Sequence, residues 1–202
     1  MIDLILDDCM NVMSKYEDNH FDLAIVDPPY GLKRFKKGGS IINKYGDNKK
    51  QWNNIKPTKE YFDELFRVSK HQIIWGANNF NLPTSEYFIV WKKGNALEFS
   101  FAMVEQAWTN IKKPAKIFEF YHTQSKEKRM HPTQKPVELY KWLLHNYSEK
   151  GQKILDTHLG SGSIAVAAHY FGVDLVGVEI DEEYYNKAKE RVDELTTQTT
   201  MF

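Results

Sequence analysis

The sequence lacks several features that would define a protein class at once. It has a single cysteine, Cys9, so no internal disulfide can form. The seven histidines stand apart from one another, and no Cys/His cluster has the spacing of a structural zinc site. No apolar run approaches the roughly 18 residues that a membrane helix needs, and the N-terminus does not have the pattern of a signal peptide. We therefore expect a cytoplasmic protein without a membrane span or a bound metal.

The chain also lacks net charge, yet its charges are unevenly distributed. Among 202 residues, 27 Lys/Arg balance 27 Asp/Glu. Residues 31–60 contain nine basic and two acidic side chains, and residues 112–135 contain seven and two. Two basic segments on a neutral protein indicate a local site for a polyanion. Composition alone still favours the plainer interpretation of lysine-rich loops exposed to solvent.

Short apolar runs alternate with amphipathic stretches, which is typical of an α/β sheet. The length suits one domain over 1–202. We expect strands at 2–6, 21–26, 71–75, 86–92, 101–110, 116–121, 152–156 and 173–179. We expect helices at 11–16, 58–69, 136–147, 161–171 and 182–195. The stretch 31–56 has no period and holds four glycines, so it predicts a functional or mobile insertion.

A glycine-rich loop follows the strand expected at 153–156. Gly160, Gly162 and Ala165 satisfy G-x-G-x-x-A between a strand and a helix, where free N–H groups can meet a ligand. Glu179 follows nineteen residues after Gly160, at the place where a carboxylate accepts ribose hydroxyls. NAD and S-adenosylmethionine both suit such a loop, and a purely structural turn stays open. Most of the sheet must precede the loop, an order unusual for a dehydrogenase.

The second motif is Asp27-Pro28-Pro29-Tyr30, directly after the strand expected at 21–26. Ligands of α/β sheets bind outside the carboxyl ends of the strands. The two prolines stiffen the turn and lack N–H groups, so Asp27 and nearby carbonyls are left as acceptors. Tyr30 adds a flat ring beside them. Rigid acceptors next to an aromatic face suit a planar amine, although a plain Pro-Pro turn with a core tyrosine is the alternative.

Together these motifs resemble a known family, the amino-methyltransferases that act on adenine N6 or cytosine N4 of DNA. The resemblance rests on Asp27-Pro28-Pro29-Tyr30, on His131-Pro132-Thr133-Gln134-Lys135-Pro136, and on Asp156 with the Gly160–Ser163 loop. The order of the motifs resembles the permuted beta group, and 73–80, 90–93 and 105–109 are similar to compact phage-type members. The resemblance implies a Rossmann-like, circularly permuted methyltransferase fold, with a mostly parallel sheet that contains one antiparallel strand.

The family's cofactor is S-adenosylmethionine, and the resemblance assigns its contacts. They are Asp156, Gly160, Ser161, Gly162 and Ser163 for the methionine end, Glu179 for the ribose, Asp8 and Cys9 for the adenine, and Thr133 and Lys135 from the start of their helix. Lys135 would pair with the methionine carboxylate, unless it is a solvated lysine. Cys9 suits a small core position equally well.

The resemblance also implies catalytic roles for Asp27, Pro28, Pro29 and Tyr30. Asp27 and the Pro28 carbonyl would accept the two amine hydrogens, so that the nitrogen lone pair points at the methyl group. Tyr30 would stack on a base rotated out of double-stranded DNA, because the amine is unreachable inside the duplex.

Two departures from the family pattern bear on recognition. Thr157 and His158 stand where the family commonly has Pro and an aromatic residue. The chain also has no separate target-recognition domain, so recognition would fall to insertions at about 31–56 and 92–130. The candidate DNA contacts are Lys33, Arg34, Lys36 and Lys37 for phosphates, and Asn78 for base edges, if it does not simply cap a turn.

These observations predict a site-specific DNA methyltransferase of a restriction-modification type, with adenine N6 as the target and cytosine N4 as the alternative. Methylation of RNA or of a protein amide is a second alternative, although both motif order and Asp27 differ from those families. A catalytically silent DNA-binding module is the third, and a dehydrogenase the weakest. The sequence leaves a homodimer open.

Overall fold

The computed structural model describes residues 1–31, 56–93, 102–121, 130 and 133–197. The strands are β1 (Ile2–Leu6), β2 (Phe21–Val26), β3 (Ser69–Trp75), β4 (Phe88–Lys92), β5 (Val104–Thr109), β6 (Lys116–Glu119), β7 (Lys153–Asp156) and β8 (Asp174–Glu179). The helices are α1 (Cys9–Met13), α3 (Lys59–Val68), the short 3₁₀ helix η3 (Ala77–Asn79), α4 (Val137–Tyr147), α5 (Ser163–Phe171) and α6 (Glu182–Thr197). None of these helices is both long and apolar enough to cross a bilayer.

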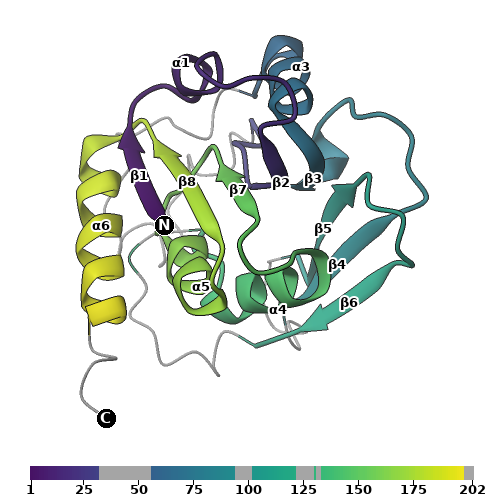
Figure 1. Ribbon diagram of the computed structural model, residues 1–202. Helices are drawn as coiled ribbons and strands as arrows, with labels where there is room; N and C mark the ends of the chain where they lie inside the picture. The colour runs from purple at the N-terminus through teal and green to yellow at the C-terminus, as the bar shows by residue number, and fades with distance from the viewer. Residues whose placement is uncertain (32–55, 94–101, 122–129, 131–132, 198–202) are drawn as a thin grey trace.

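The strands of the described chain form one sheet in the order β1-β8-β7-β2-β3-β5-β4-β6. The pairs from β1 to β3 are parallel, β5 is antiparallel to both β3 and β4, and β6 is parallel to β4. Only β5 therefore runs against the other strands, which confirms the prediction of a mostly parallel sheet with one antiparallel strand. In Figure 1, α6 lies beside β1 at one end of the sheet, and β4, β5 and β6 form the other end.

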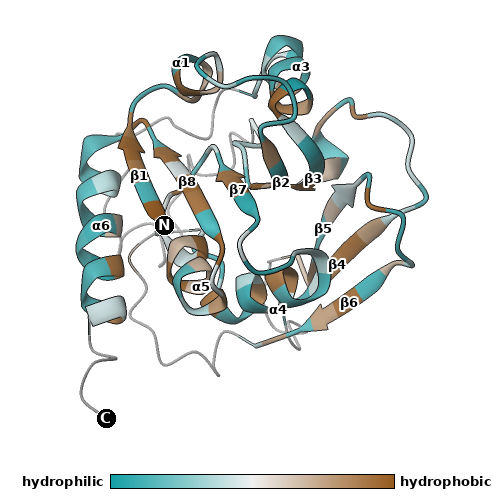
Figure 2. Cartoon of the chain, in the orientation of Figure 1, coloured by the Kyte–Doolittle hydropathy of each residue, from teal (hydrophilic) through white to brown (hydrophobic). Residues whose placement is uncertain are grey.

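Helices cover both faces of the sheet. Ile73 and Trp75 of β3 pack into a core with α4, α5 and α6, whereas Ile74 between them packs with α1 and α3. Because both faces are covered, the central strands are almost continuously apolar. Figure 2 shows this as brown segments in the strands and in α5, while α6 is largely teal.

Local signals account for where the helices begin and end. The Asp8 side chain accepts the Met10 N–H and starts α1 at Cys9, so the expected helix at 11–16 was placed too late. Gly162, with φ +71°, precedes α5, and Gly172, with φ +86°, ends it. Asp181 accepts the N–H groups of Glu183 and Tyr184 and caps α6, as predicted.

Candidate active site

A cavity of about 490 Å³ opens at the edge of the sheet where β2, β7 and β8 end. Its size is in the range of small-molecule sites. Its lining residues are Asp27, Pro28, Pro29, Tyr30, Glu105, Thr133, Gln134, Lys135, Tyr140, His158, Leu159, Gly160, Ser161, Glu179, Ile180, Asp181 and Tyr184. The two motifs predicted from the sequence, more than 120 residues apart, therefore face one cavity.

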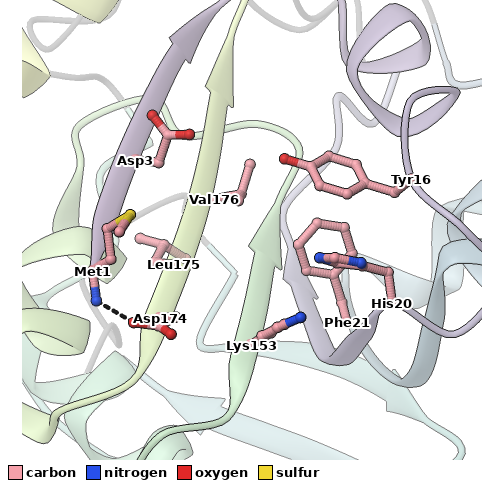
Figure 3. Close-up of a pocket in the computed structure, with 9 residues that line it drawn as sticks. All are labelled: Met1, Asp3, Tyr16, His20, Phe21, Lys153, Asp174, Leu175 and Val176. Carbon is pink, nitrogen blue, oxygen red and sulfur yellow. Dashed lines mark hydrogen bonds and ion pairs between the residues drawn. The ribbon is translucent and has the colours of Figure 1, made fainter.

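A smaller recess of about 170 Å³ lies at the opposite edge, where the same strands begin. Figure 3 shows the Met1 ammonium bonded to Asp174 on one side of this recess and the rings of Tyr16, His20 and Phe21 on the other side, with Lys153 between them. None of the predicted site residues lines this recess.

At the turn that follows β2, Asp27 is held on both carboxylate oxygens. The Tyr30 hydroxyl donates to Oδ1 at 2.5 Å, and the Lys135 ammonium pairs with Oδ2. Burial and the Asp27 charge raise the pKa of Tyr30 far above its ordinary value, so the phenol stays protonated. The Tyr30 ring lies directly against Gly76, which has φ +69°, and a Cβ at that position would overlap the ring. Gly76 therefore leaves the space that Tyr30 occupies.

Lys135 joins Asp27 to a second carboxylate that the sequence did not single out. Its side chain is 3% exposed, and Nζ lies 3.2 Å from Glu105 Oε2 and 5.4 Å from the Trp75 ring centroid. Burial opposes the charge on Lys135, but Asp27 and Glu105 outweigh it and raise the pKa. The alternative of a solvated lysine is therefore wrong. Contact between Lys135 and a cofactor stays a prediction.

Glu105 reaches the cavity because β5 is reversed, so the start of this strand lies where its neighbours end. It pairs with Lys93 as well as Lys135. Burial opposes ionisation of Glu105, but the two ammonium groups outweigh it and lower the pKa to about 2. The segment 105–109 appeared among the resembling stretches, but no local pattern gave Glu105 this position.

The glycine loop holds its carboxylates differently. Glu179 accepts the Gly160 N–H at 2.8 Å and the Asp181 N–H at 3.0 Å. Asp156, 2% exposed, accepts the His158 N–H at 3.0 Å beneath the loop. Burial raises the pKa of Glu179, and it raises that of Asp156 to about 7. Backbone N–H groups rather than cationic side chains therefore orient both acids.

A buried arginine that the sequence analysis did not identify fastens this loop to α6. Arg191 is 7% exposed, and its Nη1 donates to the Ser161 carbonyl at 2.5 Å and to Ser163 Oγ at 3.1 Å. In the sequence Arg191 belongs to a strongly charged helix, so nothing local distinguishes it from its solvated neighbours.

The structure brings most of the predicted site residues together. At the cavity are Asp27, Pro28, Pro29, Tyr30, Thr133, Lys135, Gly160, Ser161 and Glu179. The cavity lining does not include Asp8, which caps α1, half-buried Cys9, buried Asp156, Gly162, buried Ser163, or Asn78, which is exposed in η3. The predicted contacts Lys33, Arg34, Lys36 and Lys37 lie outside the described residues, as do large parts of both predicted insertions.

Comparison with known proteins places this chain in a family. Residues 72–190, more than half of the chain, match the family described as "N6_N4_Mtase: DNA methylase". The chain is 26% identical to the Type II methyltransferase M.HpaI of Haemophilus parainfluenzae, over 94% of this chain and 74% of that protein. It is 24% identical to the Type II methyltransferase M2.MboI of Moraxella bovis, over 93% and 86%.

Solved structures share the fold. The M1.HpyAVI–SAM complex matches with a TM-score of 0.63 and 19% identity, covering 95% of this chain and all of that one. The PvuII DNA methyltransferase, described as cytosine-N4-specific, matches with a TM-score of 0.63 and 12% identity, covering 98% and 92%. The predicted methyltransferase fold is thereby confirmed. On the strength of the family match, this chain is a member of the N6/N4 DNA methylase family.

Proposed function

We propose that this protein transfers the methyl group of S-adenosylmethionine to the exocyclic amine of a base in double-stranded DNA, with adenine N6 as the target. The observation that carries the proposal is the placement of Asp27. Its carboxylate lies in the same cavity as the glycine loop and Glu179, held between Tyr30 and Lys135.

The cavity residues fit the cofactor. S-adenosylmethionine, when bound, supplies a methyl group activated by its positive sulfonium. Gly160 presents backbone at a turn with φ +53°, and Glu179 retains lone pairs beyond the two N–H groups that it accepts, so it can take up ribose hydroxyls. The acidic groups at this end, Glu179 and Asp181, also favour a ligand that carries positive charge.

Asp27 acts on the target amine as an acceptor. An exocyclic amine is a poor nucleophile because its lone pair is delocalised into the ring. Each Asp27 oxygen already accepts one bond, from Tyr30 or Lys135, and each has a further lone pair. Asp27 and the Pro28 carbonyl can thus hold the amine hydrogens and stabilise the charge that develops on the nitrogen. The ion pair with Lys135 holds the carboxylate in place.

The choice of adenine rests on Asp27 as the first residue of the catalytic motif, which resembles the adenine enzymes of the family. Cytosine N4 is the alternative, and the cytosine-N4-specific PvuII enzyme has the same fold. Both bases present an amine that Asp27 can hold, so the test must identify the product.

The test is transfer of labelled methyl from S-adenosylmethionine to unmodified double-stranded DNA, followed by nucleoside digestion and mass spectrometry. We expect N6-methyl-2′-deoxyadenosine. Asp27→Ala should lower the rate at least about 100-fold, as expected for the loss of a group that stabilises the transition state, while cofactor binding is retained. Asp63→Ala, which removes an exposed carboxylate of α3, is the matched control.

N4-methylcytosine as the product would overturn the choice of adenine and keep the mechanism. Absence of label in DNA, with cofactor binding demonstrated, would overturn the proposed reaction. Loss of cofactor binding in a folded Asp27→Ala variant would contradict the division of the cavity into a catalytic end and a cofactor end.

A further inference from the structure

His158 is the cavity residue that neither the family resemblance nor the proposed reaction explains. It stands where the family commonly has an aromatic residue, two positions after Asp156. Its imidazole packs edge-on against Tyr61 of α3, with ring centroids 5.5 Å apart at 70°. An aromatic residue would satisfy that packing equally well, so the packing does not account for the two ring nitrogens.

A short hydrogen-bond chain determines which of those nitrogens carries the proton. The Tyr61 hydroxyl lies 2.6 Å from Thr157 Oγ1, which in turn lies 2.9 Å from His158 Nδ1. Tyr61 is 4% exposed, and Thr157 is its only hydrogen-bond partner among the described residues. A buried O–H group without an acceptor costs about 1–3 kcal/mol, so Tyr61 donates to Thr157.

The second bond follows from the same requirement. The Thr157 oxygen accepts from Tyr61, and its own hydrogen, also buried, needs an acceptor, which His158 Nδ1 supplies. Nδ1 is therefore the acceptor, and in the neutral ring Nε2 carries the N–H. Burial lowers the pKa of His158 to about 4, which keeps the imidazole neutral near pH 7. Within the described part of the chain, Nε2 has no hydrogen-bond partner, so it is available to a ligand.

His158 and Asp27 follow neighbouring strands at the same edge of the sheet. Strands β7 and β2 are paired in register, with Ala24 opposite Leu155, and each of the two residues comes three positions after that pair. Both residues line the cavity.

A series of ring contacts connects His158 to Tyr30. From Tyr61, which His158 contacts, rings follow one another through Phe62 (5.0 Å) and Phe80 (5.3 Å) to Tyr30 (6.0 Å). The three connecting rings do not line the cavity, whereas His158 and Tyr30 at the two ends of the series do. Tyr30 is the ring expected to stack on the target base, so this connection favours the base over the cofactor as the partner of Nε2.

We propose that His158 Nε2–H donates a hydrogen bond to a ring nitrogen of the target base, next to the amine that Asp27 accepts, and that Thr157 and Tyr61 are positioning residues that hold His158 in this tautomer. Adenine and cytosine both carry an acceptor nitrogen beside the amine. Thymine and guanine present a carbonyl and an N–H at that edge, so the pair of Asp27 and His158 would reject them. This inference rests on the proposed function.

The experiment measures S-adenosylmethionine affinity by calorimetry and kcat/KM on unmodified DNA for matched variants. His158→Phe keeps the ring and removes the donor, and we expect kcat/KM to fall about 10- to 100-fold with cofactor affinity unchanged. His158→Gln, which retains an N–H donor, should recover part of that loss. His169→Phe, at an exposed position of α5, is the control.

A spectroscopic arm tests the tautomer directly. Long-range ¹H–¹⁵N spectra of the wild-type imidazole should show the proton of His158 on Nε2, and Thr157→Val should remove that preference and lower kcat/KM. A proton on Nδ1 in the wild type, or wild-type kcat/KM in His158→Phe, would overturn the proposal. So would a loss in His158→Phe that is explained entirely by weaker cofactor binding. An inactive wild-type enzyme would instead refute the proposed function.

Discussion

The two ends of the cavity differ in the groups that hold their carboxylates and in the direction in which the carboxyl pKa values are shifted. At the proposed catalytic end, carboxylates pair with the ammonium groups of buried Lys135 and part-exposed Lys93, and the pKa of Glu105 is lowered to about 2. At the glycine-loop end, backbone N–H groups hold the acids, and burial raises the pKa of Asp156 to about 7 and also that of Glu179. The catalytic end is thus neutralised within the protein. The glycine-loop end has carboxyl groups without cationic side chains to pair with them, so a positively charged ligand would be favoured there.

Removal of the Lys135 ammonium group should have the largest effect of the predicted changes, because it takes away the cation that neutralises the two carboxylates. Lys135→Met leaves Asp27 and Glu105 facing one another without their shared cation. We expect the free energy of unfolding to fall by about 3–5 kcal/mol, measured by urea denaturation. Lys187→Met removes an exposed pair with Glu183 on α6 and should change stability by at most about 0.5 kcal/mol. Equal losses in the two variants would contradict the buried network.

The pH dependence of stability tests the raised pKa of Asp156 at the glycine-loop end. A carboxyl group whose folded pKa is raised stabilises the fold at low pH, and this contribution is lost as the pH rises from 3.8 towards about 7. In Asp156→Asn the side chain still accepts the His158 N–H but does not titrate. The wild type should therefore lose stability relative to the variant between pH 4 and pH 8, by at most about 4 kcal/mol. Parallel urea midpoints across this range would refute the raised pKa.

A pair of glycine substitutions distinguishes an effect on catalysis from an effect on stability. Gly76→Ala places a side chain at φ +69° and against the Tyr30 ring, whereas Gly151→Ala meets similar backbone strain at φ +79° with no atom within 4 Å. Both should lose about 1–2 kcal/mol of stability. Only Gly76→Ala should also lower kcat on DNA, because it displaces Tyr30. Normal kcat in that variant would mean that the position of Tyr30 is unimportant.

The smallest expected effect concerns the loop carboxylate. Glu179→Gln keeps one oxygen for Gly160 or Asp181 but loses an acceptor and the charge. We expect S-adenosylmethionine affinity, measured by calorimetry, to fall about tenfold, which corresponds to about 1.4 kcal/mol, with little change in stability.

The sequence predicted what local pattern determines. β1 and β2 have their expected bounds, since each is a short, largely apolar run that ends at a polar turn. Asp27, Tyr30, Gly160 and Glu179 were identified because each lies at or just after the end of a strand in a recognisable motif. The DNA contacts proposed at 33–37 lie outside the described residues and remain predictions.

What the sequence did not predict depends on contacts between distant segments. Glu105 is at the cavity only because β5 is reversed. The residues of a strand do not by themselves determine its direction or its register in the sheet. Arg191 acts on a loop about thirty residues away. The tautomer of His158 depends on Tyr61, which is 96 positions from Thr157. Each of these side chains has an ordinary local context, and only the fold gives it a specific partner.

The reversed strand β5 also means that the connection between β4 and β5 could be replaced by another segment. Because β5 runs against β4, the chain leaves the sheet at Lys93 and returns at Met103 on the edge where Asp27 lies, and the Lys93 N–H donates to the Met103 carbonyl at 2.9 Å. Strand pairing fixes both attachment points, so an exchanged segment between them would not shift the register of the sheet. The β4–β5 connection is thus a place where the corresponding segment of a relative can be exchanged without disturbing the strand pairing.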